Sequence, residues 1–368
     1  MSVSESAPLQ VAAGVEESMR FTYNGLPSRV IFGAGSRARV AEELDRLGIK
    51  CAIVISTPEQ SALAGELARV IGSRAGIVYP GAAQHTPVAV TESALLAVQS
   101  VRADGCLAVG GGSTIGLAKA IALRTDLPQV AVPTTFAGSE MTPIIGQTEQ
   151  GRKTTQRSMK VLPETVIYDP ELTVTMPPAI AGPSGMNAVA HAVEALYAED
   201  ANPIMSMMAE EAIRAFGKAL PVIMRDNRNI EAHTEALYGA WLAGACLGNV
   251  GMAIHHKICH TLGGTFNLPH ADTHCLMIPY SAAYNREAAP RAMARIAGAL
   301  GAADAPSALY DLMQQVAQKK SLAQMGMTKT DLDKAADLAV QNPYYNPRPI
   351  TREGVRAMLQ AAFEGLRP

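Results

Sequence analysis

Four of the chain's eight histidines lie in one short stretch, HHKICHTLGGTFNLPH, at residues 255–270. On a helix, His256 and His260 are four residues apart and therefore share a face. His270 follows a Leu-Gly-Gly sequence at 262–264, where we expect the helix to break. Imidazole is a common metal ligand and carries protons near neutral pH. The spacing therefore predicts either a metal site or a metal-free site that moves protons.

A second pair of polar residues lies upstream, in GMNAVAHAVEAL. Asn187 and His191 are also four residues apart, and we expect Asn187 near the start of its helix. The two helical pairs and His270 are predicted to meet in one pocket. A lone histidine is more often a core or surface residue, but a matched set favours a functional site. His255 and His274 fall outside the shared face and are expected to support the others.

A glycine-rich turn is predicted within AVGGGSTIGLAKAIA, at residues 108–122. The segment reads as a strand, a turn and the start of a helix. Gly111 and Gly112 let the backbone approach a phosphate, whose charge a helix N-terminus stabilises. Ser113 is expected to cap the helix and to contact the same phosphate. A tight turn without a ligand would need similar glycines, so the turn alone leaves both interpretations open.

The next predicted strand ends in VPTTFAGSEMT, which contributes the hydroxyls of Thr134, Thr135 and Ser139. Ligands of open α/β sheets bind at the carboxyl ends of the strands, so two such strand ends favour a nucleotide. The strand CAIVIS ends at Ser56 and Thr57, and we expect no acidic residue near them. A carboxylate there would hold the ribose and repel a 2′-phosphate, so NADH and NADPH both stay open.

Strand-like and helix-like segments alternate in the first half of the chain. This alternation predicts an α/β domain with a mostly parallel sheet and helices on both faces. From 182 to about 340 the sequence reads as helix. We therefore predict a tail at 1–20, a dinucleotide-binding domain at 21–175 and a helical catalytic domain at 176–368. The predicted strands are 29–33, 51–56, 75–81, 105–112, 129–135 and 164–170, and the helices between them are 36–48, 62–72, 91–103 and 113–125.

Composition narrows the classes of function. The net charge is -2 and no block of lysine and arginine occurs, which argues against a nucleic-acid partner. No apolar run is long enough to span a bilayer, and the first residues lack the pattern of a signal peptide. Five scattered cysteines, an odd number, argue against a disulfide framework. We expect a cytoplasmic protein whose partner is a small molecule.

Five motifs together resemble the iron-containing (group III) alcohol dehydrogenases. They are GGGSTIGLAKAIA, PTTFAGSEMT, DPELTVTMPP, SGMNAVAHAVEAL and HHKICHTLGGTFNLPH, and the resemblance covers residues 20 to 365 in the same order. It implies an N-terminal nucleotide-binding α/β domain, an all-helical C-terminal domain and an active site between them. This fold is similar to that of dehydroquinate synthase. The resemblance also implies a homodimer.

Two departures from the family pattern stand out. In metal-dependent members, one aspartate and three histidines hold a divalent ion, and they match Asn187, His191, His256 and His270. A neutral amide is a much poorer ligand than a carboxylate, so we expect no metal. If an ion is bound, the three histidines are its expected ligands. The second departure is Gly116, which stands where many members carry an acidic residue.

Both departures are typical of the family members that reduce 2-maleylacetate to 3-oxoadipate in the degradation of aromatic compounds. The resemblance implies this reaction of a dicarboxylate, with NADH or NADPH. Hydride adds to a carbon–carbon double bond conjugated with a ketone, and hydrogen-bond donors can stabilise the resulting enolate. The implied catalytic residues are His256 as principal donor, with His191, His260, His270 and Asn187. The implied cofactor residues are Gly111, Gly112, Ser113, Thr134, Thr135, Ser139, Lys153, Ser56 and Thr57.

Some residues and some alternatives stay open. Lys257 and Arg348 are candidate anchors for the substrate carboxylates, and Tyr280 stands where many members carry histidine, which suggests a variant pocket. A metal-dependent alcohol or aldehyde oxidoreductase of the same family would retain iron or zinc. A non-redox lyase or cyclase of the dehydroquinate synthase type would use NAD without net consumption. A nucleotide-binding protein without catalysis would not need the histidines.

Overall fold

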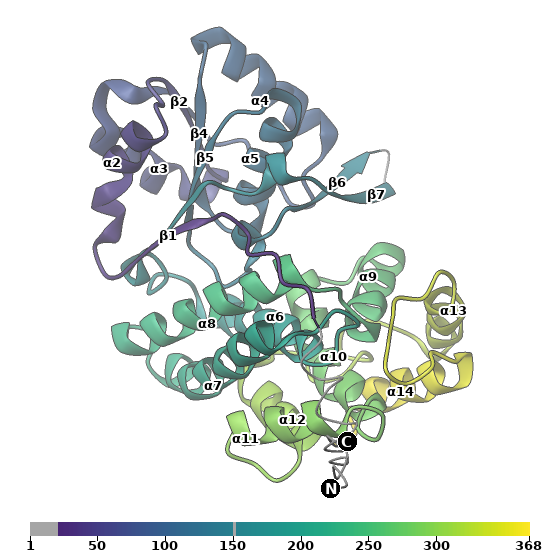
Figure 1. Ribbon diagram of the computed structural model, residues 1–368. Coiled ribbons are helices and arrows are strands. Elements are labelled where there is room, and N and C mark those ends of the chain that lie inside the picture. The colour runs from purple at the N-terminus through teal and green to yellow at the C-terminus, as the bar shows by residue number, and fades with distance from the viewer. Residues whose placement is uncertain (1–20, 150–151) are drawn as a thin grey trace, which may run out of the picture.

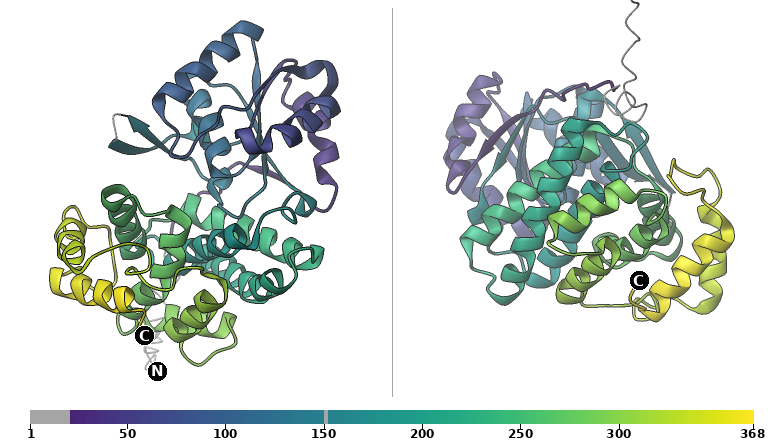
Figure 2. Two further views of the ribbon diagram at one scale, coloured as in Figure 1. Left: turned by 180° about the vertical axis from the view of Figure 1, so that it is seen from behind. Right: turned by 60° about the horizontal axis from the view of Figure 1, so that its bottom comes forward.

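The computed structural model describes residues 21–149 and 152–368, so the tail predicted at 1–20 lies outside the described residues. The described chain forms an N-terminal domain built on a sheet and a C-terminal domain built of helices, one above the other in Figure 1. Figure 2 shows the same two parts from behind and from below. The predicted fold class is confirmed.

The N-terminal domain contains a six-stranded parallel sheet with the order β1-β8-β5-β4-β2-β3. The strands are β1 (Arg29–Phe32), β2 (Ala52–Ile55), β3 (Ala75–Tyr79), β4 (Gly105–Gly110), β5 (Gln129–Pro133) and β8 (Thr165–Tyr168). After β2 the chain adds β3 on one side, and it then returns to form β4 on the other side. The strand order therefore reverses between β2 and β4, and ligands of such sheets bind in the crevice at that point.

Helices cover both faces of the sheet, as predicted. They are α2 (Val40–Arg46), α3 (Ser61–Ile71), α4 (Val88–Val101) and α5 (Gly112–Thr125). Val54 and Leu107 pack on the side of α2 and α3, whereas Ile53 and Cys106 pack on the side of α4 and α5. Successive side chains of a strand point to opposite faces, so a strand covered on both sides is apolar throughout.

A hairpin that the sequence analysis did not predict lies between β5 and β8. Its strands, β6 (Ile144–Glu149) and β7 (Arg152–Arg157), pair antiparallel in a sheet of their own. Most of this segment is polar, so it lacks the apolar run that marks the other strands. In Figures 1 and 2 the hairpin projects from the sheet domain on the side where α9 (Ile254–Phe266) lies.

The C-terminal domain is helical, as predicted. Its helices are α6 (Pro178–Ala195), α7 (Pro203–Arg225), α8 (Ile230–Asn249), α9 (Ile254–Phe266), α10 (His270–Tyr284), α11 (Pro290–Ala299), α12 (Ala305–Val316), α13 (Lys329–Ala339) and α14 (Arg352–Glu364). α6 starts at a proline, which suits the first turn, and is buried over most of its length. Asn187 lies in the middle of α6, not near its start. The helix break predicted at 262–264 is also wrong, because α9 tolerates both glycines and continues to Phe266.

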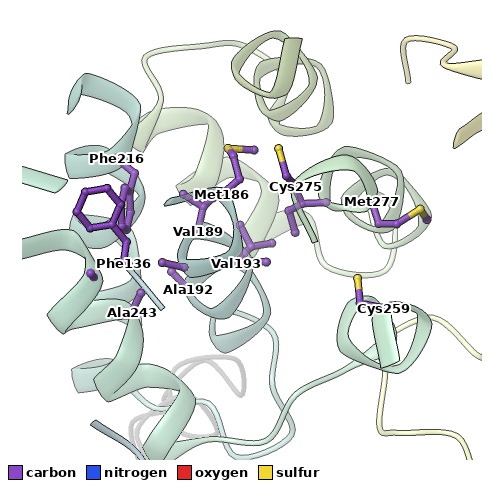
Figure 3. Packing of buried hydrophobic residues seen from close by; sticks show 14 of the residues in the cluster. Phe136, Met186, Val189, Ala192, Val193, Phe216, Ala243, Cys259, Cys275 and Met277 are labelled. Atoms are coloured by element: carbon purple, nitrogen blue, oxygen red, sulfur yellow. The ribbon is translucent and has the colours of Figure 1, made fainter. Parts of the chain in front are cut away.

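The loop after β5 is anchored in the core of the helical domain. Phe136 of this loop is fully buried and meets Phe216 of α7 edge-on, with 5.9 Å between the ring centroids. Its backbone N–H donates to the Ser184 Oγ of α6 at 3.1 Å. Figure 3 shows both rings at one side of a cluster that continues through α6 to Cys275 and Met277 of α10. One apolar core therefore joins the two domains.

No single helix in the described part of the chain is long and apolar enough to cross a membrane. α8 and α9 pass the same test only as a pair, and they are bent by 95° at the break between them.

Candidate active site

Helices α6, α9 and α10 bring six histidine side chains together, namely His191, His255, His256, His260, His270 and His274. The ring centroids are 5.1 Å apart for His191 and His256, and 4.9 Å apart for His256 and His274. They are 6.0 Å apart for His256 and His260, and 6.3 Å apart for His260 and His270. His260 and His270 are exposed, whereas the other four are buried. The structure thus brings together the four histidines that were expected to meet.

One face of α6 carries three polar residues, Asn187, His191 and Glu194. They are four and three residues apart, so they follow one another along the helix. The Asn187 Oδ1 is buried and has no hydrogen-bond partner among the described residues. Burial, reinforced by the neighbouring imidazoles, holds the pKa of His191 well below its usual value. His191 is therefore neutral at pH 7.

Glu194, which the sequence analysis did not single out, is a fully buried carboxylate next to the cluster. It accepts hydrogen bonds from the backbone N–H groups of Ala253 at 2.9 Å and His255 at 2.7 Å. The His256 Nδ1 lies 2.6 Å from the Glu194 Oε2. The His256 Nε2 is buried and has no partner in the described chain. A signal was present in the sequence, because Glu194 is the single charged residue of α6.

A chain of buried hydrogen bonds supports the cluster on its other side. The His255 Nδ1 lies 2.9 Å from the Ser281 Oγ, and the His255 Nε2 lies 2.9 Å from the His274 Nδ1. The Cys259 Sγ approaches the same His255 Nε2 at 3.6 Å. Burial is the main reason that the pKa values of His255 and His274 lie well below their usual values. Both rings are therefore neutral, and they hold the neighbouring imidazoles in place.

The residues that match the family's metal ligands are a poor fit for a divalent ion. Asn187 offers a neutral amide and His191 a neutral imidazole, so the matched set contains no carboxylate ligand for the ion. Within the described residues, three potential ligand atoms lie within 4.8 Å of one another in a different group, His255, Cys259 and His274. Those atoms are close because they hydrogen-bond to one another.

The glycine-rich turn lies where β4 meets α5. Gly111 precedes α5 and Gly112 opens it, and the first N–H groups of a helix have no partner within the helix. A Cβ added at Gly111 would lie 2.8 Å from the Thr135 Cγ2, so the turn has room for glycine only. Ser113 lies inside the first turn and makes no capping hydrogen bond, so its predicted capping role is wrong. The free N–H groups of this turn can hold a pyrophosphate.

Gly116, the second departure from the family pattern, has a local cause. A Cβ added at Gly116 would lie 2.3 Å from the Thr86 Oγ1, and Thr86 is buried. An acidic side chain at this position would displace Thr86. The position of Thr86 is therefore compatible with glycine at residue 116 and not with the acidic residue of the family pattern.

The other predicted cofactor residues lie at neighbouring strand ends. Gly110 and Pro133 pair across β4 and β5, so the residues that follow them lie side by side. The Thr134 Oγ1 accepts a hydrogen bond of 2.6 Å from the Gln60 Nε2, which comes from the turn after β2. Ser56 is fully buried at the end of β2, and its Oγ has no partner among the described residues. Three adjacent strand ends thus meet at the reversal in strand order.

The expectation of no acidic residue near Ser56 and Thr57 is wrong. Glu59 is exposed in the short 3-10 turn, Pro58–Gln60, that follows Thr57. Hydrogen bonds from its own backbone N–H and from the Thr57 hydroxyl hold the pKa of Glu59 below its usual value. The prediction considered the strand end itself, and the carboxylate lies just beyond it. A negative charge is therefore present beside the reversal in strand order.

Lys119 of α5 is fully buried and holds the segment after β5. Its Nζ donates to the backbone oxygens of Ser139, Thr142 and Ile144 at 2.5, 2.7 and 2.9 Å. Burial lowers the pKa of Lys119 to about 7. Three backbone acceptors suit an ammonium group, which has three N–H donors. The backbone of Ser139 is therefore fixed from the sheet domain.

Lys257 borders the exposed side of the histidine cluster. Its Nζ donates to the Gln341 O at 2.7 Å and lies 5.9 Å from the centroid of the Tyr344 ring. The Tyr344 hydroxyl in turn lies 3.2 Å from the His260 Nδ1. A cation is thus held beside His260. The last predicted residue, Lys153, pairs with Thr148 across the β6–β7 hairpin.

Arg348 lies away from the cluster. The Arg348 guanidinium stacks on Tyr284 at 4.2 Å and donates to the Tyr284 backbone oxygen. Tyr284 ends α10 and His270 begins it, which separates their backbones by about 21 Å. Arg348 is therefore not an anchor at the histidines. Tyr280 is buried and faces Tyr310 with 6.4 Å between the ring centroids, and its hydroxyl has no partner among the described residues.

Comparisons with known proteins match most of the chain. Residues 27–170 match the family model for iron-containing alcohol dehydrogenase, and residues 182–363 match the C-terminal model of the Fe-containing alcohol dehydrogenase family. The maleylacetate reductase of Sphingobium indicum is 53% identical to this chain over 350 residues, which are 95% of this chain and 99% of that protein.

Solved structures agree with this match. The maleylacetate reductase of Agrobacterium tumefaciens has a TM-score of 0.93 and 52% identity over 95% of this chain and 100% of its own. The sulfoacetaldehyde reductase of Bifidobacterium kashiwanohense in complex with NAD+ has a TM-score of 0.87 at 22% identity over 94% and 99%, a likeness of fold alone. The parallel sheet and the helical domain with its histidine cluster define a two-domain oxidoreductase. The chain belongs to the iron-containing alcohol dehydrogenase family.

Proposed function

We propose that the chain reduces 2-maleylacetate to 3-oxoadipate with a reduced nicotinamide cofactor, as a step in the degradation of aromatic compounds. The observation that supports this most is the 53% identity to a maleylacetate reductase over 95% of the chain. The amide at Asn187 supports it as well, because a metal-dependent alcohol oxidoreductase would need a carboxylate ligand there. We further propose that the enzyme acts as a homodimer in the cytoplasm.

The proposed substrate is a dianion whose carbon–carbon double bond is conjugated with a ketone. The reduced nicotinamide, when bound, supplies a hydride to the alkene carbon farther from the ketone. Negative charge then moves to the ketone oxygen as an enolate, which hydrogen-bond donors stabilise. The enolate carbon next to the ketone takes up one proton, so one hydride and one proton are added overall.

The roles of the side chains follow from this chemistry. His256 is the proposed donor to the ketone oxygen, since its Nε2 has no partner in the described chain. His260 and His270 are exposed and are proposed to pass the proton to the enolate carbon. His191 and Asn187 line the proposed pocket from α6. Lys257 is proposed to bind one substrate carboxylate.

The proposed cofactor is NADH in preference to NADPH. Glu59 follows β2, where a carboxylate holds the ribose hydroxyls and repels a 2′-phosphate. The proposed pyrophosphate residues are Gly111, Gly112 and Ser113, and the proposed ribose and nicotinamide residues are Ser56, Thr57, Thr134, Thr135, Ser139 and Lys153.

The test is an assay of NADH and NADPH oxidation with 2-maleylacetate, on protein that a chelator has stripped of metal. We expect turnover without added metal, and a higher kcat/KM with NADH. Turnover that depends on iron or zinc would indicate a metal-dependent alcohol or aldehyde oxidoreductase instead. A product formed without net oxidation of the cofactor would indicate a lyase or cyclase. Absence of any reaction with 2-maleylacetate would contradict the proposal.

A further inference from the structure

We propose that Glu194 is a positioning residue for His256. It fixes the proton on the His256 Nδ1, so that the Nε2 alone can address a substrate oxygen, and it places a negative charge behind this ring. The inference rests on the proposed function, because that function makes His256 the donor to the ketone oxygen.

The protonation state of Glu194 follows from its partners. The side chain is completely buried, and four N–H groups surround its two oxygens. The backbone groups of Ala253, His255 and His256 lie at 2.9, 2.7 and 3.4 Å, and the ring Nδ1 of His256 lies at 2.6 Å. The three backbone groups can only donate, and an ionised carboxylate can accept all of these hydrogen bonds. Glu194 is therefore charged, at the N-terminus of α9, where the helix dipole favours an anion.

The orientation of His256 follows from this charge. Because the carboxylate can only accept, the His256 Nδ1 must carry the hydrogen of the 2.6 Å contact. A distance this short is typical of a charge-assisted hydrogen bond. The second nitrogen, Nε2, is left buried without a partner in the described chain. A buried polar atom of this kind calls for a ligand or an ordered water.

The neighbouring histidine on α9 differs from His256 in this respect, whereas the His191 Nδ1 and the His274 Nε2 are also buried without a partner among the described residues. His255 lies next to it on the same helix, but both of its ring nitrogens are engaged, by Ser281 on one side and His274 on the other. His255 therefore has no nitrogen left for a substrate. Of these two adjacent histidines, His256, whose ring contacts the Glu194 carboxylate, is the one with a ring nitrogen available.

The charge of Glu194 matters when negative charge builds on the ketone oxygen. To donate to this oxygen, the Nε2 must carry a hydrogen in addition to the one on Nδ1, which makes the ring an imidazolium, and the carboxylate at the Nδ1 side stabilises this cation. The same logic explains a buried carboxylate behind a catalytic histidine in hydrolases. Glu194 also has a structural role, because α9 has no side-chain cap of its own. The experiment must therefore separate the two roles.

The variant Glu194→Gln keeps the size of the side chain and an oxygen for the α9 backbone, but it removes the charge. We expect kcat with 2-maleylacetate to fall about 100-fold or more, with a much smaller change in the KM for NADH. The double variant Glu194→Gln/His256→Ala should be no slower than His256→Ala alone, because the two residues act as a unit. Thr328→Ala is the matched control, since it removes the cap of α13 and should lower stability without changing kcat.

If the double variant were slower than His256→Ala by the whole factor that Glu194→Gln alone loses in kcat, the two residues would act independently. Glu194 would then only cap α9, and the proposal would be wrong. An unchanged kcat in Glu194→Gln would lead to the same conclusion. A second measurement needs neither a substrate nor a Glu194 variant. The proton NMR spectrum of the wild type should contain a strongly downfield resonance, protected from exchange, which is missing in His256→Ala.

Absence of this resonance from the wild type would overturn the proposal even if Glu194→Gln does not fold. Failure of the proposed function is a separate outcome. In that case the wild type would not oxidise NADH with 2-maleylacetate, whereas the resonance would still report on the Glu194–His256 contact.

Discussion

Gly244 of α8 lies against Gly138 of the loop after β5, backbone to backbone, across the boundary between the two domains. A Cβ added at Gly244 would lie 2.6 Å from the Gly138 O, and one added at Gly248 would lie 2.6 Å from the Met141 O. Gly138 also lies beside the histidine cluster, since its own Cβ would be 3.6 Å from the His191 Nδ1. The two glycines of α8 therefore seat the predicted cofactor loop next to the histidines.

Replacement of Gly244 by alanine should push this loop away from α8. We expect Gly244→Ala to lower the free energy of unfolding by about 1–3 kcal/mol, because neither backbone can move far, and to raise the KM for NADH. Thermal unfolding and a titration of NADH fluorescence would measure the two effects. Gly298→Ala in α11 is the control, since a Cβ there meets nothing within 4 Å. If Gly244→Ala and Gly298→Ala had the same stability and the same KM for NADH, the contact between Gly244 and Gly138 would be unimportant.

Glu59 should set the choice between the two nicotinamide cofactors. Its removal in Glu59→Gln should raise the kcat/KM for NADPH relative to NADH by about tenfold, because a 2′-phosphate is then no longer repelled. Glu66→Gln is a suitable control, because Glu66 is also exposed but lies on α3, outside the β2 turn. A cofactor ratio that Glu59→Gln leaves unchanged would place the ribose elsewhere.

Asn187→Asp should change the affinity of the site for metal. The Asn187 Oδ1 is already buried without a partner, and an aspartate would add the missing negative charge beside His191. We expect the variant to retain more iron or zinc than the wild type after dialysis, as measured by elemental analysis. Asn249→Asp on α8 is a control for the added charge alone. Equal metal contents in all three proteins would mean that the amide is not what weakens binding.

The fold was largely predictable because its signals are local. β2 and β4 are apolar throughout, since helices cover both of their faces, and each run is visible in the sequence. The β6–β7 hairpin was missed because its strands are polar and are not buried on both sides. Local spacing also indicated the shared face of His256 and His260.

The rest of the site depends on contacts between distant segments. Glu194 stands 62 residues before His256, and nothing in its own helix reveals that it meets the start of α9. The His255 nitrogens are occupied by Ser281 and His274, so which histidine has a free nitrogen could not be seen from spacing. Arg348 was a reasonable anchor by charge alone, but the fold carries it to the far end of α10.

Three buried histidines should make the stability of the protein depend on pH. Burial keeps the pKa values of His191, His255 and His274 well below the usual value of 6.5, so these rings stay neutral in the folded state. In the unfolded chain they take up protons as the pH falls through about 6.5. The unfolded state then binds more protons than the folded state, so the free energy of unfolding decreases as the pH falls below this value.

For three groups, the decrease can reach about 4 kcal/mol for each pH unit well below pH 6.5, and these groups contribute no slope between pH 7.5 and 8.5. Urea unfolding of the apoprotein at a series of pH values from 5 to 8.5 would measure it. His274→Gln removes one of these groups and should reduce the slope by the share of one histidine, about 1.4 kcal/mol for each pH unit, although it also costs stability at every pH through the lost contact with His255. A slope that His274→Gln leaves unchanged would mean that the buried rings are not what makes the protein sensitive to acid.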